Sequence, residues 1–549
     1  MNKGIKAVSA MCALTIVIVS TGKADPTVVR TEVIGPFVGQ DAKLHPANLA
    51  PQRIEYYGTD LGFSYEHRGQ LQFLFGDTSA TEVYTPIQHS TAGRYDDSFG
   101  SIDLRAWRDP TRIGPGNIPL VKLGQNPGTT EASAIDPGHA MDLGKTPMAG
   151  FSNGRREFAI FNLTKPQGCR ADADCGSGLS CDSGLGFVGA PYSQEEGLTL
   201  PCLDGDAGCN TDTMTDAGGV AIQQSGFCTD HSSTIWADTP AGRIGSVAVQ
   251  QRIGMRSLTD PRQYLDTRRW LTNKFLNVTA RTVNDFEPAR GSGFRHQDYR
   301  LAHGTGRHQR LFLWGRPGFV GVEAARRTLG VYFAYVDLPT GSGYPWNLHY
   351  YVGTSARGTP QFSPNEQDAA PLDLNSRTTG VQTAEIHDIV NQASVAWIEP
   401  LQKWVMFYGG GLSTLPKPGL PHCGVLELFA GRECSKVVVG NGAVYMRTAD
   451  DPWGPWSPPQ EVVVGGDRAI AGSGLYGEGG VLRSPACTTT GCATPTRSPH
   501  YRADEYGFLY AANIIAEWAR PAGAGADLLW NASTWDPYRV VLLRTRINR

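Results

Sequence analysis

Two aspartates near the start of the chain have a spacing that would let them act on one bond. Asp60 lies in Gly-Thr-Asp-Leu-Gly, and Asp77 follows 17 positions later in Phe-Gly-Asp-Thr. A strand, a tight turn at residues 66–69 and a returning strand would bring both carboxyl groups to the same end of an antiparallel hairpin. A glycine lies within two positions of each aspartate, so the backbone can bend and a ligand can approach closely. Two carboxyl groups facing one cleft are what hydrolysis of a glycosidic bond requires.

A structural interpretation of the same residues stays open. Gly-Asp-Thr and Thr-Asp-Leu-Gly are also turn motifs, in which an aspartate caps its own backbone. If the catalytic interpretation holds, the environment must divide the roles of the two carboxyl groups. A buried or crowded carboxyl group keeps its proton near neutral pH, whereas a solvated or hydrogen-bonded one stays ionised.

Further polar and aromatic residues are candidates for the same site. Those expected in loops near strand ends, or with acid–base or hydroxyl-binding groups, are Asp97, His139, Arg316, Glu385, His387 and Glu478. Those whose rings could stack on a sugar face are Trp314, Trp397 and Tyr408. The competing interpretation is that loops are polar in any protein and that most aromatic residues of β-sheet proteins belong to the core.

The elements that must position these residues are short strands. Five β-rich, aromatic runs recur at similar intervals once a cysteine-rich stretch is set aside, at 71–75, 157–161, 310–314, 404–408 and 508–511. Each is followed by a second run with strand alternation, at 101–107, 244–252, 331–336, 444–447 and 539–544. With 66 glycines and 36 prolines to form turns, this pattern predicts an all-β fold.

Radial repetition of small antiparallel sheets would leave few exposed edges, so we expect a five-bladed β-propeller over residues 25–549. A pair of stacked β-sandwiches is the alternative. Helix is scarce, with 261–274 and 512–518 as the only candidates.

Composition limits the class of protein. The chain has 549 residues and a formal net charge of −3, so no basic excess points to a nucleic-acid partner. Residues 1–24 have the pattern of an export signal, with Lys3 and Lys6, an apolar run and a final Gly-Lys-Ala. We expect cleavage after Ala24 and a secreted or periplasmic protein, with an uncleaved anchor as the alternative. No later stretch is apolar enough for a membrane span.

The cysteines point to disulfide bonds. Of 11 cysteines, Cys12 lies in the export signal, and an even number remains for an oxidising compartment. Six of them fall within residues 168–228, at positions 169, 175, 181, 202, 209 and 228, and four form the local couples 423/434 and 487/492. We interpret 168–228 as a disulfide-rich insertion within the second blade, with a disordered loop or a zinc site as alternatives. No metal or cofactor is otherwise expected.

A succession of motifs resembles one family of glycoside hydrolases. The motifs are the Asp60 and Asp77 elements, Thr146-Pro-Met-Ala-Gly-Phe151, Trp314-Gly-Arg316, Ser394-Val-Ala-Trp397, Gly454-Pro-Trp-Ser457 and Tyr476-Gly477. Together they resemble the bacterial endo-D-arabinofuranases, which cut the D-arabinan of mycobacterial cell walls. The resemblance covers most of residues 55–544 outside the cysteine-rich stretch. It implies a five-bladed propeller whose catalytic pair corresponds to Asp60 and Asp77.

The sequence therefore leads to an expectation with two alternatives. We expect an exported, monomeric, endo-acting glycosidase for furanoside polymers, with a polysaccharide as its partner, Asp60 as nucleophile and Asp77 as general acid/base. The first alternative is a propeller that binds glycans without cleaving them. The second is a glycosidase that acts on another pentose polymer.

Overall fold

The structure is a computed structural model, and parts of the chain are described by it. The described residues are 25–39, 58–79, 98–123, 145–163, 168–169, 171–174, 180–182, 213–215, 221–223, 226–229, 235–239, 242–246, 249–256, 264–272, 274–275, 277–284, 309–316, 330–338, 347–356, 358–375, 390–410, 413–414, 437–438, 443–464, 487–488, 491–492, 509–534 and 539–549. The predicted export signal lies outside them, as does most of the cysteine-rich stretch.

In this part of the chain, five antiparallel sheets of four or five strands carry the fold. The first sheet consists of β2 (Gly58–His67), β3 (Gln70–Ser79), β4 (Ser98–Asp103) and β5 (Lys122–Leu123). The second consists of β6 (Lys145–Ser152), β7 (Glu157–Leu163), β15 (Val249–Arg256) and β16 (Tyr264–Thr272). The third consists of β17 (Asn277–Asn284), β18 (Gln309–Arg316), β19 (Tyr332–Leu338), β20 (His349–Thr354) and β21 (Pro360–Ser363).

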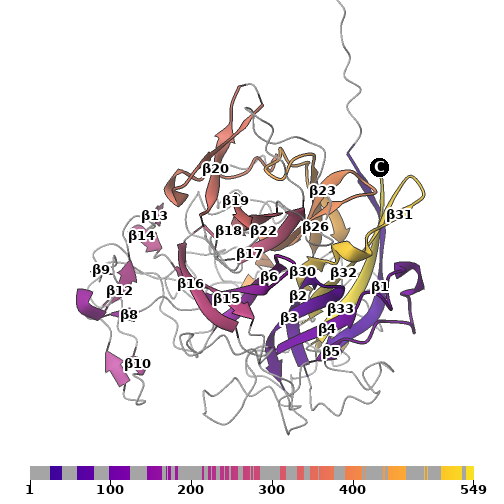
Figure 1. Ribbon diagram of the computed structural model, residues 1–549, viewed down its shortest axis with the longest axis horizontal. Coiled ribbons are helices and arrows are strands. Elements are labelled where there is room, and N and C mark those ends of the chain that lie inside the picture. The colour runs from indigo at the N-terminus through magenta and orange to yellow at the C-terminus, as the bar shows by residue number, and fades with distance from the viewer. Residues whose placement is uncertain are drawn as a thin grey trace, which may run out of the picture.

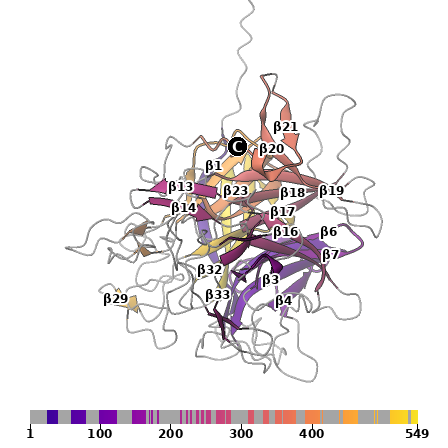
Figure 2. The same cartoon turned by 90° about the vertical axis from the view of Figure 1, so that its left-hand side faces the viewer.

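The remaining two sheets complete the set. The fourth consists of β22 (Val390–Ile398), β23 (Lys403–Gly410), β26 (Val444–Ala449) and β27 (Gln460–Val463). The fifth consists of β30 (Tyr510–Ile514), β31 (Arg520–Ala522), β32 (Gly525–Thr534), β33 (Arg539–Asn548) and β1 (Thr27–Gly39). In the third sheet, the β20–β21 hairpin projects from the body of the molecule (Figures 1 and 2).

The smaller elements lie outside these sheets. They are β8 (Gly168–Cys169), β9 (Ser180–Asp182), β10 (Thr213–Thr215), β11 (Ala221–Gln223), β12 (Gly226–Thr229), β13 (Ile235–Thr239), β14 (Gly242–Ser246), β24 (Ser413–Thr414), β25 (Val437–Val438), β28 (Cys487–Thr488), β29 (Gly491–Cys492) and the 3₁₀ turns η2 (Pro110–Arg112), η3 (Asp172–Asp174), η6 (Glu366–Asp368) and η9 (Ala516–Trp518). Strands β8 to β14 follow β7 in sequence and precede β15, yet β7 and β15 pair directly. Cys181 of β9 forms a disulfide bond; a disulfide framework for the whole 168–228 stretch stays a prediction.

The five sheets are arranged around a common centre. The first strand of each in chain order, β30 in the case of the fifth, contacts the first strands of two others, in the succession β2, β6, β17, β22, β30 and back to β2. These five inner strands group in the middle of Figure 1. The all-β class and a propeller-like arrangement are therefore confirmed.

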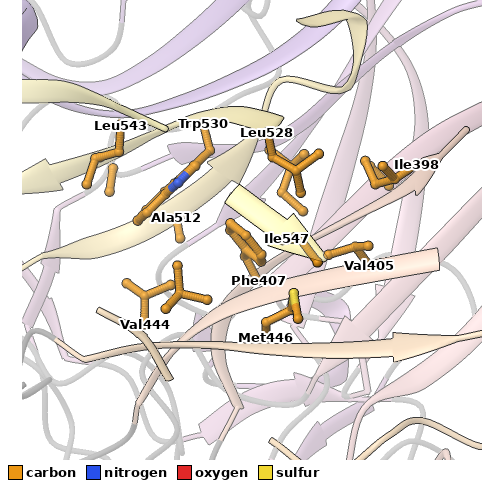
Figure 3. Packing of buried hydrophobic residues seen from close by; sticks show 14 of the residues in the cluster. Ile398, Val405, Phe407, Val444, Met446, Ala512, Leu528, Trp530, Leu543 and Ile547 are labelled. Carbon is orange, nitrogen blue, oxygen red and sulfur yellow. The ribbon is translucent and has the colours of Figure 1, made fainter. Parts of the chain in front are cut away.

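Apolar side chains fill the spaces between consecutive sheets. In one such cluster, the ring of Phe407 from β23 meets that of Trp530 from β32 edge-on, with 5.4 Å between the centroids (Figure 3). Comparable clusters join the first sheet to the second, the second to the third, the third to the fourth and the fifth back to the first. Because both faces of each sheet are buried in this way, most strands are apolar on both sides.

The N-terminal strand closes the arrangement. β1 pairs with β33 from Thr27↔Asn548 to Gly39↔Arg539, so the start of the described chain forms the outer edge of the last sheet. The two strands come from opposite ends of the sequence.

Both helix predictions are wrong. Residues 264–272 form β16, which pairs along its length with β15, and residues 510–514 form β30, followed by the single 3₁₀ turn η9. In both segments pairing with a neighbouring strand outweighs local helix propensity, which is a weak determinant of structure.

Arg281 of β17 lies at the axis and binds three other inner strands. Its Nε donates to Val395 O at 2.7 Å, its Nη1 to Ser64 O at 3.0 Å and its Nη2 to Ile514 O at 3.0 Å. Nη2 also donates to Ser394 Oγ at 3.2 Å. The side chain is buried, and burial lowers the pKa of the guanidinium, an effect that the charge of Glu517 opposes. Arginine remains a cation under such conditions.

We predict that Arg281→Ala lowers the free energy of unfolding by about 3–5 kcal/mol, because it leaves buried carbonyl groups on three strands without donors. Chemical denaturation followed by tryptophan fluorescence measures this. The exposed Arg155 provides the control Arg155→Ala, for which we expect a change within about 0.5 kcal/mol. Equal stabilities of the two variants would contradict an axial role for Arg281.

Candidate active site

The hairpin predicted for Asp60 and Asp77 is present. β2 and β3 pair antiparallel, with Asp60 opposite Gly76 and Gly58 opposite Ser79. The turn is centred on Arg68 and Gly69, whose φ angles of 51° and 82° are those of a type I′ hairpin. It lies one residue further along than predicted. The backbone of Asp77 directly follows the partner of Asp60, so the two Cα atoms lie at the same end of the hairpin.

The Asp60 carboxylate is buried and held by the last sheet. Asp60 is 7% exposed. Tyr510 of β30 donates its hydroxyl hydrogen to Oδ2 of Asp60 at 2.8 Å. A Cβ on Gly76 would lie 2.5 Å from Oδ1 of Asp60. The carboxylate therefore lies directly over the Gly76 backbone and contacts the fifth sheet through Tyr510.

Two strained residues lie beside this contact. Leu61 and Ala511 have φ angles of 61° and 52°, in the left-handed region that residues with a Cβ rarely occupy. They are the neighbours of Asp60 and Tyr510, and they pack against each other in one apolar cluster. Asn531 Nδ2 supports the bend by donating to Leu61 O at 3.1 Å and Gly62 O at 3.2 Å. Strain of this kind costs about 1–3 kcal/mol per residue and tends to occur at functional sites.

Irregularities gather at the same end of the inner strands. Register shifts occur near the beginnings of β2, β6, β22 and β30, whereas β17 pairs with β18 without a shift. β-Bulges bend a strand and redirect its side chains, and they are over-represented next to active sites. The beginnings of the inner strands are therefore the end of the fold at which a site is expected.

The other predicted acid–base residues cannot be placed beside Asp60. The side chain of Asp77 is outside the described part of the structure, although its backbone is in β3. Asp97, His139, Glu385, His387 and Glu478 lie wholly outside the described residues. The pairing of two carboxyl groups across a cleft stays a prediction.

The three aromatic residues predicted to stack on a sugar are buried. Trp314 is 2% exposed, donates its indole hydrogen to Pro452 O at 2.8 Å and packs against Phe312, Phe333 and Trp404. Trp397 is also buried, against Trp404. Tyr408 is buried and accepts a hydrogen bond from Arg447 at its hydroxyl. All three belong to the apolar cluster between the third and fourth sheets, and a stacking role for them stays a prediction.

Arg316 is compatible with its predicted role. It is the last residue of β18 and lies opposite Asn277, the first residue of inner strand β17. It is 3% exposed. Its place in the strand brings it to the end of the third sheet at which the inner strand begins.

Sequence reasoning missed the hydroxyl of Tyr510 and the amide of Asn531. Tyr510 is distant from Asp60 in sequence, and Asn531 lies in an Asn-Ala-Ser sequon that suggests a surface position. Among the described residues, no group of three or more His, Cys, Asp or Glu side chains could hold a metal ion. The helices in this part of the chain include none long and apolar enough to span a membrane.

Comparisons with known proteins show only distant similarity. No family model and no curated protein matches the chain. Among solved structures, a protein from Bacteroides ovatus ATCC 8483 is 10% identical, with a TM-score of 0.35 over 90% of this chain and 86% of that one. The catalytic domain of the Coprinopsis cinerea GH62 α-L-arabinofuranosidase is 10% identical, with a TM-score of 0.29 over 95% and 98%. The α-L-arabinofuranosidase PaAbf62A of Podospora anserina, in complex with cellotriose, is 8% identical, with a TM-score of 0.30 over 95% and 98%.

TM-scores of this size fall short of a shared fold. The propeller-like arrangement therefore rests on the sheet topology of the chain itself. Any proposal about its function rests on the residues around Asp60.

We predict that Gly76→Ala displaces the Asp60 carboxylate. The new methyl group would lie 2.5 Å from Oδ1 of Asp60 and 2.8 Å from Leu61 Cδ1, and such overpacking costs about 1–3 kcal/mol of stability. Thermal unfolding measures the loss, and a crystal structure of the variant shows the displaced carboxylate. Gly114 provides the control Gly114→Ala, because nothing lies within 4 Å of its would-be Cβ and its φ is outside the left-handed region. A Gly76→Ala variant with an unmoved Asp60 would contradict the close contact.

Proposed function

We propose that the chain is an exported, endo-acting glycoside hydrolase on a five-bladed propeller, and that its substrate is a furanoside polymer of the D-arabinan class. The ring of contacts among five inner strands supports the blade number. The motif resemblance supports the substrate class. The observation that carries the chemistry is the buried Asp60 carboxylate, which Tyr510 holds at the bulged end of the inner strands.

Asp60 is suited to the role of the nucleophile. A hydroxyl donor fixes the orientation of its carboxylate and stabilises the negative charge. In a retaining reaction this carboxylate attacks the anomeric carbon while Asp77 protonates the departing glycosidic oxygen. Asp77 then removes a proton from water, the water attacks the same carbon, and the bond to Asp60 breaks. The hairpin register supports this pairing because it brings the two backbones together.

Asp60→Asn and Asp77→Asn should each lower kcat on arabinan by a factor of about 10⁴ or more, with unfolding unchanged, because each removes one of the two groups that the reaction needs. Release of reducing ends measures the rate, and NMR of the first product shows whether the configuration is retained. Asp337, whose side chain is 65% exposed in an ion pair with Arg310, provides the control Asp337→Asn, which should retain full activity. Full activity of either site variant would reject the assignment.

Tyr510→Phe should lower kcat about 10-fold or more and move the acidic limb of the pH profile to higher pH. The reason is that the ionised carboxylate of Asp60 loses its hydroxyl donor, which makes ionisation less favourable. Tyr65→Phe is the matched control, because the Tyr65 hydroxyl also donates to a carboxylate, that of Glu157 at 3.2 Å, but at the other end of β2. A pH profile that is the same in Tyr510→Phe as in the wild type would exclude the contact from catalysis.

The substrate class is tested with a panel of D-arabinan, L-arabinan and other pentose polymers, followed by chromatography of the products. Oligosaccharides released from D-arabinan support the proposal, including endo action. Cleavage of another pentose polymer but not of D-arabinan would show that the proposed substrate class is wrong. Binding without any cleavage would make the protein a glycan-binding propeller.

A further inference from the structure

Four inner strands can be aligned through the bonds of Arg281. Arg281 contacts Ser64 in β2, Val395 in β22 and Ile514 in β30, which fixes one level along the axis. Thr279 donates to Ala393 O. Thr279 lies two residues before Arg281, and Ala393 lies two residues before Val395, the acceptor of Arg281 Nε. β17 and β22 therefore run in the same direction. The Tyr510–Asp60 bond shows the same for β30 and β2.

A second level follows about four residues before the first. Four residues before the Arg281 contacts lie Asp60 in β2 and Tyr510 in β30, and Asn277 lies four residues before Arg281 itself in β17. Gln392 of β22 lies three residues before Val395, within the bulge of that strand. We call these four residues the Asp60 layer. Because β2 contacts β6 and β30, whereas β17 and β22 contact each other, Asn277 and Gln392 lie across the axis from Asp60.

The side chain of Asn277 lies on the axial side of its strand. β17 pairs without a register shift, so Asn277, Thr279 and Arg281 share one face. The side chains of Thr279 and Arg281 bind carbonyl groups of the fourth sheet. Val278 and Ala280, on the opposite face of β17, pack toward the second sheet. Gln392 precedes Ala393, the partner of Thr279, within the bulge of β22.

Both amides hold a buried donor for which the described residues offer no acceptor. Asn277 is 3% exposed and Gln392 is 4% exposed, and neither Asn277 Nδ2 nor Gln392 Nε2 has a hydrogen-bond partner within the described part of the chain. Such a group costs about 1–3 kcal/mol, and native proteins retain it where a ligand or another function needs it. Two such donors at one level, facing a carboxylate, point to a shared cause.

We infer that Asn277 and Gln392 are substrate-binding residues whose NH₂ groups donate to hydroxyl oxygens of a neutral sugar ring held between them and Asp60. The inference rests on the proposed function and adds the opposite wall of the site. Neutral amide donors match uncharged hydroxyl oxygens, whereas an acidic sugar is better matched by cationic donors. The two amides therefore suit the hydroxyl groups of a neutral sugar unit.

The test compares Asn277→Ala and Gln392→Ala with Gln460→Ala. Gln460 is the matched control, because its amide bonds are made within the protein, to Pro26 O at 2.7 Å and from Val28 N at 3.0 Å. We expect the two layer variants to raise KM for arabinan, and Kd for arabinan oligosaccharides by calorimetry, about 5- to 10-fold. Their Tm should stay equal or rise, whereas Gln460→Ala should lower Tm and leave KM unchanged.

The outcomes separate this inference from the proposed function. If the wild type binds an arabinan oligosaccharide without cleaving it, the proposed function fails, and weaker binding by both layer variants still supports the inference. If the wild type cleaves arabinan and both layer variants keep its KM and Kd, the inference fails alone. A fall in Tm like that of Gln460→Ala would identify the amides as structural, and absence of oligosaccharide binding by the wild type would also overturn the inference.

Discussion

The interaction on which the site depends is that of the Arg281 guanidinium with three neighbouring inner strands. A buried cation must have its donors satisfied, and here the acceptors are carbonyl and hydroxyl oxygens of β2, β22 and β30. A strand that slipped by one residue would turn these oxygens away. The guanidinium therefore fixes the positions of four strands relative to one another along the axis. The residues of the Asp60 layer depend on this alignment for their common level.

Local features of the sequence were sufficient for the hairpin and insufficient for the site around it. Asp60 and Asp77 are close in sequence, and glycine at the turn makes their pairing a short-range matter. Tyr510 and Asn531 reach the Asp60 hairpin only through closure of the whole ring, which no local pattern encodes. The alternation in Asn277-Val-Thr-Ala-Arg281 was a readable signal of a strand with one polar face. That this polar face lies toward the axis of the fold follows only once the neighbouring strands are known.

Two other segments show how a distant partner decides the local structure. Trp314 precedes Gly315 and Arg316 in a motif that suggests a ligand, but Gly315 is required because the ring of Phe275 lies against its backbone. Packing thus explains the glycine, and the predicted sugar-binding role of its two neighbours stays a prediction. A helix was expected over residues 261–274, yet pairing with β15 places residues 264–272 in a strand. In both cases a distant partner decides the outcome.

The position of Asp60 couples the site to closure of the ring. Asp60 belongs to the first sheet and Tyr510 to the last, so their hydrogen bond spans the seam at which the two ends of the fold meet. The last sheet is complete only when β1 pairs with β33. Leu61 and Ala511 can stay in the left-handed region only while packing and the Asn531 bonds hold them there. If the last sheet separates from the first, both bends can relax and the carboxylate loses its orientation, so an ordered Asp60 requires a closed ring.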